Sequence, residues 1–217
     1  MSGKIESNMK ILVLGATGGT GRLIVRDALA EGHSVVALVR SEQSANEVPG
    51  ADVFVGNALD EGSLVRALDG CDAVISSLGT GMSPFREVTL LSDATRALTA
   101  AMTRSGARRL VCITGLGAGD SQGHGGLLYD RLILPLLLRN VYRDKDRQEA
   151  AIRISSLDWV IVRPAVLNDE PPHGNVRAVT DLTGVHGGKI ARADVARFVV
   201  DQLTTDIWLR QTPLILW

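Results

Sequence analysis

The stretch from Lys10 to Gly21, KILVLGATGGTG, decides the fold of this chain. Its apolar run at 11–14 is typical of a buried strand, and the segment 20–31 after the glycines is typical of a helix. A glycine-rich turn between such elements lets the backbone approach a phosphate, and the N–H groups that open the helix then face the anion. We therefore expect a nucleotide pyrophosphate to bind here, although a glycine-rich turn without a ligand would give the same pattern.

Three glycines of this turn have separate roles in the prediction. Gly15 permits the sharp turn, Gly18 lets the backbone come close to the phosphates, and Gly21 lets helix and strand pack closely. Their spacing is G-x-x-G-x-x-G rather than G-x-G-x-x-G. This spacing is typical of the short-chain dehydrogenase branch of dinucleotide-binding folds.

The composition indicates a globular protein with no strong electrostatic preference. The chain has 217 residues, of which 45% are apolar and 22% charged, and a net charge of −1. That length suits one domain, and this charge gives no reason to expect nucleic acid or a membrane as partner. Cys71 and Cys112 both lie in apolar runs, so we expect buried free thiols. Neither the cysteines nor the four histidines have metal-ligand spacing, and we expect no metal.

The first residues show no targeting signal. Residues 1–9 lack the apolar core of a signal peptide and are expected to form a short disordered leader. The longest apolar run, 132–138, is too short to span a bilayer. A cytoplasmic location is the resulting expectation.

Short apolar runs that alternate with helical stretches predict the architecture. Strands are expected at 11–14, 33–40, 51–57, 71–78, 109–114, 159–162 and 213–217, and helices at 20–31, 61–68, 84–104 and 193–203. Strands apolar on both faces indicate a parallel sheet covered on both sides. With right-handed crossovers this favours a doubly wound, three-layer α/β fold with a mostly parallel sheet, as a single domain at 10–217. The polar segments 115–126 and 168–189 follow strands and are expected to form the walls of a substrate pocket.

The end of the second expected strand bears on the choice of cofactor. An NAD site usually has an acidic residue there, whereas this chain has Arg40 and Ser41. A guanidinium can bind a 2′-phosphate through two hydrogen bonds, so NADP(H) is expected in preference to NAD(H). The alternative is that Arg40 lies in water at the edge of the sheet. Asn57 and the turn 78–80 close later strands, and we expect them near the adenine and the nicotinamide-side ribose.

Several motifs in order along the chain resemble a known family. They are GATGGTG at 15–21, LVR at 38–40, CDAVISSLGT at 71–80, RLVCITG at 109–115, the helix and strand at 145–167, and KIARADVA at 189–196. The chain resembles the atypical short-chain dehydrogenases/reductases of the NAD(P)H-binding group that includes flavin reductase, also called biliverdin reductase B. The resemblance implies a Rossmann fold and a bound nicotinamide cofactor.

The resemblance also implies which residues form the site. The implied cofactor-binding residues are Gly15, Thr17, Gly18, Gly19, Thr20, Gly21, Arg40, Ser41, Asn57, Ala58, Leu78, Gly79, Thr80, Thr114, Lys145, Pro164 and Ala165. The implied catalytic residues are Thr114, Lys145 and Tyr142. The wider superfamily uses Tyr-x-x-x-Lys, but here Val141 stands four before Lys145 and the tyrosine follows it. Tyr142 and Lys145, three apart, still share a helix face and could cooperate, or Tyr142 could simply pack at a helix rim.

These features favour hydride transfer from NADPH to a flat conjugated acceptor, such as a flavin, a quinone or a linear tetrapyrrole, because such acceptors need less help with proton transfer than a ketone does. Two alternatives stay open: a non-catalytic NADP-binding redox sensor or assembly protein, and, with less support, a nucleotide-sugar epimerase.

The segment 127–138 is apolar almost all round, and Pro135 is expected to kink or end a helix there. This segment could be a lid over an aromatic acceptor, a homodimer contact or a buried helix.

Overall fold

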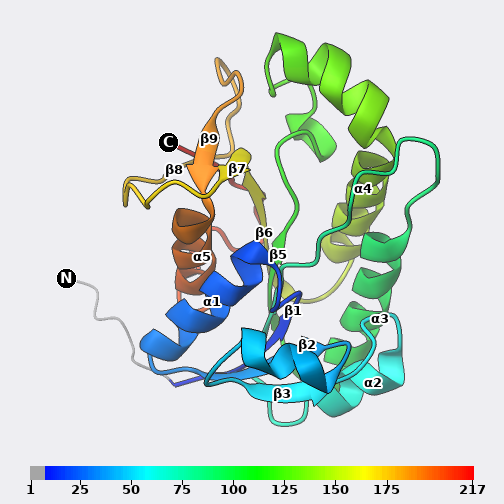
Figure 1. Ribbon diagram of the computed structural model, residues 1–217, viewed down its shortest axis with the longest axis vertical. Helices are drawn as coiled ribbons and strands as arrows, with labels where there is room; N and C mark the ends of the chain where they lie inside the picture. The colour runs from blue at the N-terminus through cyan, green and yellow to red at the C-terminus, as the bar shows by residue number, and fades with distance from the viewer. Residues whose placement is uncertain (1–7) are drawn as a thin grey trace.

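The structure, a computed structural model that describes residues 8–217, is a central sheet between two layers of helices (Figure 1). The strands are β1 Lys10–Leu14, β2 Ser34–Val39, β3 Asp52–Val55, β4 Ala73–Ser76, β5 Arg109–Ile113, β6 Asp158–Pro164, β7 Val166–Asn168, β8 Arg177–Val179, β9 Lys189–Ala191 and β10 Leu214–Leu216. The helices are α1 Gly19–Ala30, α2 Glu61–Ala67, α3 Leu90–Ser105, α4 Arg139–Arg153 and α5 Arg192–Asp201, with short 3-10 helices at Glu42–Glu47 and Gly119–Ser121 and a π-helix at Tyr129–Leu138.

The main sheet has eight strands in the order β3-β2-β1-β4-β5-β6-β10-β8. Neighbouring strands run parallel except β10 and β8, which are antiparallel. Strands β7 and β9 form a separate parallel pair. The direction of winding reverses between β1 and β4, as in other doubly wound sheets. The predicted single-domain, three-layer α/β fold is therefore confirmed.

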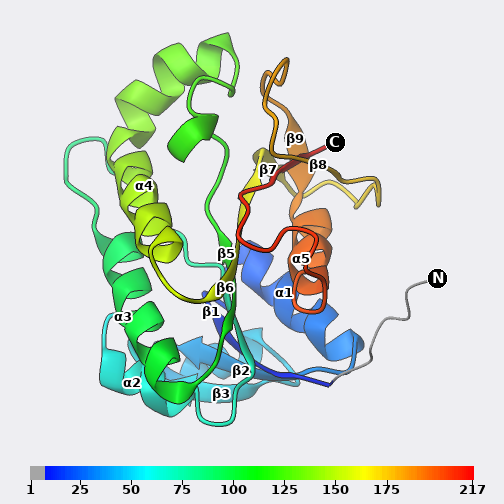
Figure 2. The same ribbon diagram turned by 180° about the vertical axis from the view of Figure 1, so that it is seen from behind.

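Each face of the sheet has its own hydrophobic core. Helices α1 and α5 cover one face, and α2, α3 and α4 cover the other, as both views show (Figures 1 and 2). Ile24 of α1 and Val199 of α5 belong to one buried cluster, and Leu64 of α2, Leu98 of α3 and Ile152 of α4 belong to the second. The apolar character of the strands on both faces, which predicted this burial, is thus explained by packing.

Helix α3 differs from its prediction. It begins at Leu90 rather than at Pro84, and residues 84–89 form a loop. The fully buried carboxylate of Asp144, on α4, accepts hydrogen bonds from the backbone amides of Leu91 (2.8 Å) and Ser92 (3.3 Å). A carboxylate at this position satisfies the open amides of the helix N-terminus and suits the helix dipole. A residue far along the chain therefore fixes where α3 starts.

The segment 127–138 forms a helix that is mostly exposed. Its π-helix includes Pro135 and runs directly into α4, so the proline does not end the helix. Figure 1 shows this helix beyond the end of the sheet. Of its leucines only Leu134 is buried, while Leu127 and Leu128 are 72% and 66% exposed. The expectation of a helix buried against the sheet is wrong, because no other element among residues 8–217 covers most of this segment. The lid and the homodimer contact stay predictions.

Little of the expected leader falls within the described residues. Residues 1–7 lie outside them, so the prediction of disorder there concerns a part of the chain that the structure does not describe. The backbone amide of Met9 donates a hydrogen bond to His33 Nδ1 (3.2 Å), and the Met9 carbonyl oxygen accepts one from the backbone amide of Ser34 (2.9 Å). Among residues 8–217, the helices are all too short or too polar to cross a membrane.

Candidate functional site

A cleft of about 770 Å³ opens at the carboxyl ends of β1, β2, β4 and β5. Most of the predicted site residues line it: Gly15, Thr17, Gly18, Gly19, Thr20, Arg40, Asn57, Ala58, Leu78, Gly79, Thr80, Thr114, Tyr142 and Lys145. Gly21, Ser41, Pro164 and Ala165 do not line it. Ligands of doubly wound folds bind at such a crevice, so the structure brings residues from distant segments to the expected position.

The glycine turn has the geometry that a diphosphate site requires. Gly15 has φ +73°, and a Cβ there would lie 2.5 Å from the carbonyl oxygen of Ser77. A Cβ on Gly21 would lie 2.0 Å from the carbonyl oxygen of Gly15, so only glycine allows α1 to pack this closely on the turn. Gly18 is the N-cap of α1, and its position supplies no side-chain cap for the helix. The amides that open α1 are thus left for an anion, and the residues present fit a dinucleotide diphosphate.

The end of the cleft beside β2 is lined by Arg40, Ser44, Glu47 and Asn57. Arg40 is exposed and has no ion-pair partner within residues 8–217. Glu47 Oε2 lies 3.2 Å from Arg22 Nη1, and this ion pair offsets the negative charge of Glu47. The sequence reasoning missed Ser44 and Glu47, because they lie on a short 3-10 helix that no motif marks.

Lys145 and Tyr142 come together at the other end of the cleft. Lys145 Nζ donates to the carbonyl oxygen of Thr114 (2.6 Å) and lies 4.7 Å from the centre of the Tyr142 ring. A Cβ on Gly115 would lie 3.0 Å from Lys145 Nζ and 3.3 Å from Tyr142 Oη, so both polar atoms lie close to this glycine. Tyr129 Oη donates to Tyr142 Oη at 2.7 Å.

Burial sets the acid strength of both groups. It lowers the pKa of Lys145 to about 8, although the nearby carboxylate of Glu149 opposes this change. It raises the pKa of Tyr142, and the contact with Tyr129 adds to the rise. Lys145 therefore has a pKa of about 8, whereas the raised pKa of Tyr142 keeps this residue protonated, so it is not a base.

The hydroxyl of Thr114 belongs to a buried ionic network that the sequence reasoning did not find. It donates to Glu149 Oε1 (2.8 Å), and the same carboxylate accepts two bonds from Arg163, from Nε at 2.9 Å and from Nη2 at 2.6 Å. Arg163 Nη1 also contacts Asp120 Oδ1 at 2.7 Å. Although burial acts in the opposite direction, the hydrogen bond and charge of Arg163 hold the pKa of Asp120 below its ordinary value. The network ties the wall of the cleft to the loop 115–126.

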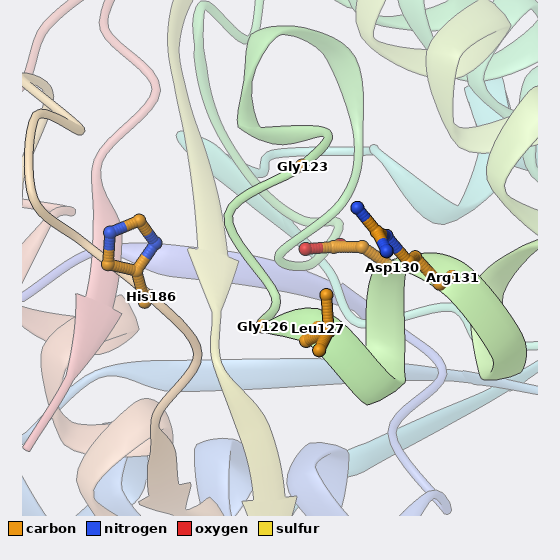
Figure 3. A pocket seen from close by; sticks show the side chains of 6 residues that line it. All are labelled: Gly123, Gly126, Leu127, Asp130, Arg131 and His186. Carbon is orange, nitrogen blue, oxygen red and sulfur yellow. The ribbon is translucent and has the colours of Figure 1, made fainter.

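The two segments predicted as pocket walls meet at a second, smaller hollow of about 450 Å³ (Figure 3). Gly123, Gly126 and His186 line it together with Leu127, Asp130 and Arg131 of the helical segment. Figure 3 shows His186 across the hollow from Asp130 and Arg131. The amide of Gly187 donates to the carbonyl oxygen of His124 (2.6 Å), which holds the two segments together.

The fold and the cleft together define a dinucleotide-binding protein of the Rossmann class. Residues 15–206 match the NAD(P)H-binding family, and the chain belongs to this family. It is 33% identical over 204 residues, 90% of this chain and 88% of the relative, to a Bacillus subtilis protein named as the uncharacterized sugar epimerase YhfK.

Solved structures share the whole fold. ChuY, described as an anaerobilin reductase of Escherichia coli O157:H7, has a TM-score of 0.81 and 25% identity, with 95% of this chain and 96% of that chain covered. A short-chain dehydrogenase/reductase of Veillonella parvula, solved with NADP, has a TM-score of 0.80 at 15% identity, with 97% and 95% covered. At this identity, the similarity to the Veillonella parvula protein is one of fold alone. The chain thus has the fold of NAD(P)H-binding oxidoreductases.

Proposed function

We propose that this protein is an NADPH-dependent reductase that passes a hydride to a flat conjugated acceptor, such as a flavin, a quinone or a linear tetrapyrrole. The observation that carries the proposal is the composition of the large cleft. It has a glycine turn for a diphosphate, Arg40 beside β2 with no ion-pair partner among residues 8–217, and Lys145 with Tyr142 beside Gly115 at its far end. A reducing compartment such as the cytoplasm suits the two buried free cysteines.

The preference for NADPH over NADH rests on Arg40. Its guanidinium lines the cleft and is not used by any carboxylate of the described residues. A 2′-phosphate would give it a charged, bidentate partner, whereas the 2′-hydroxyl of NADH offers neither charge nor a second acceptor. The glycine turn would hold the diphosphate, and Lys145 would hold the nicotinamide-side ribose. When bound, the cofactor supplies the hydride.

The chemistry of the far end favours a conjugated acceptor over a simple ketone. Reduction of a ketone places charge on one oxygen and needs a strong, well-placed acid. Tyr142 is a weak acid here, since burial raises its pKa. Leu90, Leu138 and Val141 line the cleft near Lys145 and would exclude water from a flat ring. A conjugated acceptor spreads the incoming electron pair, so that positioning supplies most of the effect.

Stopped-flow kinetics tests the proposal. Purified protein is mixed with NADPH and either FMN or a naphthoquinone, and NADPH absorbance is followed. We expect oxidation faster than that of the free cofactor with at least one acceptor, and a lower rate for Lys145→Met. Gly79→Ala is the matched variant for binding: no atom lies within 4 Å of the new Cβ, so the fold is retained while the added methyl enters the cleft and raises the Kd for NADPH. No acceleration with either acceptor contradicts the proposal.

Two other functions have specific support and separate outcomes. A nucleotide-sugar epimerase is favoured by the name of the Bacillus subtilis relative, and would convert UDP-glucose to UDP-galactose in the presence of NAD. A non-catalytic NADP-binding sensor or assembly protein is favoured by the engagement of Tyr142 with Tyr129 and of Lys145 with Thr114. It would bind NADP(H) in calorimetry without turnover of any of these substrates.

A further inference from the structure

Arg192 lies within the motif at 189–196, but it is not among the expected cofactor-binding or catalytic residues. It is the first residue of α5 and lines the same cleft as Gly18, Gly19 and Thr20. A Cβ on Gly19 would lie 3.2 Å from both Cδ and Nε of Arg192. The arginine side chain therefore lies directly against the first residue of α1. Two positive groups, the guanidinium and the amides that open α1, share this end of the cleft.

Within the described part of the chain, the guanidinium of Arg192 has a single carboxylate partner. Arg192 Nη1 donates to Asp169 Oδ1 at 2.9 Å, and the two side chains are 29% and 86% exposed. Asp169 directly follows β7 and Arg192 directly follows β9, and these strands pair with Asn168 opposite Ala191. The ion pair thus joins the segment 168–189, a predicted wall of the substrate pocket, to the glycine turn.

Two facts argue against a purely structural role for this pair. An ion pair with one partner so exposed contributes little to stability. The segment 168–189 is also fastened to α5 by a buried carboxylate, since Asp194 accepts hydrogen bonds from the amides of His173 (2.8 Å) and Gly174 (3.0 Å). The Asp169–Arg192 pair is therefore not needed to hold the segment on the domain.

We propose that Arg192 binds the diphosphate of the cofactor, and that Asp169 competes with the diphosphate for its guanidinium. This proposal rests on the proposed function, because it assigns a further cofactor-binding residue to the same cleft. A diphosphate offers two anionic groups to a planar donor, whereas the exposed carboxylate of Asp169 offers a weak, hydrated partner. Cofactor binding then draws Arg192 away from Asp169, which loosens one attachment of the pocket wall when the cofactor is present.

The competition makes two substitutions act in opposite directions. Calorimetry of the full-length protein with NADP⁺ should show a Kd raised about tenfold or more in Arg192→Gln, the loss typical of a charged hydrogen bond. Asp169→Asn should lower the Kd a few-fold. Arg197→Gln is the matched control, because this arginine is on the same helix but is 70% exposed and contacts Glu31. Arg192→Lys keeps the charge without the planar fork and should fall between wild type and Arg192→Gln.

A second ligand separates the diphosphate contact from general effects. Adenosine 2′-monophosphate lacks the 5′-diphosphate, so its affinity should be unchanged in Arg192→Gln but reduced in Arg40→Gln. The inference is overturned if the wild type binds NADP⁺ and Arg192→Gln binds it equally well, or if Asp169→Asn weakens binding as Arg192→Gln does. If the wild type does not bind NADP⁺ at all, the proposed function is overturned together with this inference. If the wild type binds NADP⁺ and only the variants behave differently from the expectation, the inference about Arg192 fails and the proposed function stands.

Discussion

Removal of the Glu149 side chain should strongly destabilise the domain. This side chain is 2% exposed and that of Arg163 is 1% exposed. The carboxylate accepts two bonds from Arg163, one from Thr114 and one from Arg153 (3.1 Å). In Glu149→Ala the buried guanidinium of Arg163 keeps, of its ion-pair partners among residues 8–217, only Asp120, whose side chain is 65% exposed. Loss of one partner of a buried pair destabilises by roughly 3–5 kcal/mol.

That loss is a large share of the stability of an ordinary domain, which is about 5–15 kcal/mol. For a chain of this length each kcal/mol shifts the Tm by roughly 2–4 °C, so a fall on the order of 10 °C is expected. Urea unfolding followed by tryptophan fluorescence and a thermal scan by circular dichroism would measure both quantities.

Two further variants test the reasoning about Glu149. Arg153→Gln removes a partner whose side chain is 41% exposed, and should change stability by less than about 1 kcal/mol. The double variant Glu149→Leu with Arg163→Met replaces the pair by apolar groups and should recover most of the loss, because no buried charge is left alone. A loss for Glu149→Ala as small as that of Arg153→Gln would refute the account.

Three other predictions follow from the same contacts. Gly21→Ala places a Cβ 2.0 Å from the carbonyl oxygen of Gly15, so it should lower the free energy of unfolding by several kcal/mol and unfold at clearly lower urea concentration. Gly18→Ala, whose Cβ has its nearest contact at 3.3 Å, should lower the free energy of unfolding much less. Lys145 is charged only below its pKa of about 8, so the Kd for NADPH, measured by fluorescence titration, should rise as pH increases through 8, and this step should vanish in Lys145→Met. Asp144→Asn weakens the cap on the α3 amides and should lower the free energy of unfolding by roughly 1–3 kcal/mol in urea; an unchanged midpoint would contradict the capping role.

Local features of the sequence were sufficient to predict the first strand, the glycine turn and the first helix. The run 11–14 and the glycines after it fix a strand, a turn and a helix through contacts between near neighbours, such as Gly21 against Gly15. The apolar strands likewise predicted a parallel sheet with both faces covered, and the order of the sheet confirmed it. Because strand ends of a doubly wound sheet meet at one crevice, the sequence also predicted that Arg40 and Gly79 would line one cleft, and the resemblance to the family implied that Lys145 would join them.

Other features of the site depend on pairs that the sequence leaves unspecified. The buried network of Glu149, Arg163 and Thr114 joins three elements whose side chains meet only when α4 packs on the sheet. Periodicity marks an amphipathic face but does not identify a charged partner on another element, so the network went unpredicted.

By itself, the sequence determined the layered parallel architecture and the glycine turn, because both follow from short-range chain geometry and from which residues avoid water. Tertiary structure alone decided that α3 starts at Leu90, that the helix of 129–138 is exposed, and that Arg192 lies against Gly19. Each of these depends on which distant segment becomes a neighbour, and that choice is made by the packing of the whole domain.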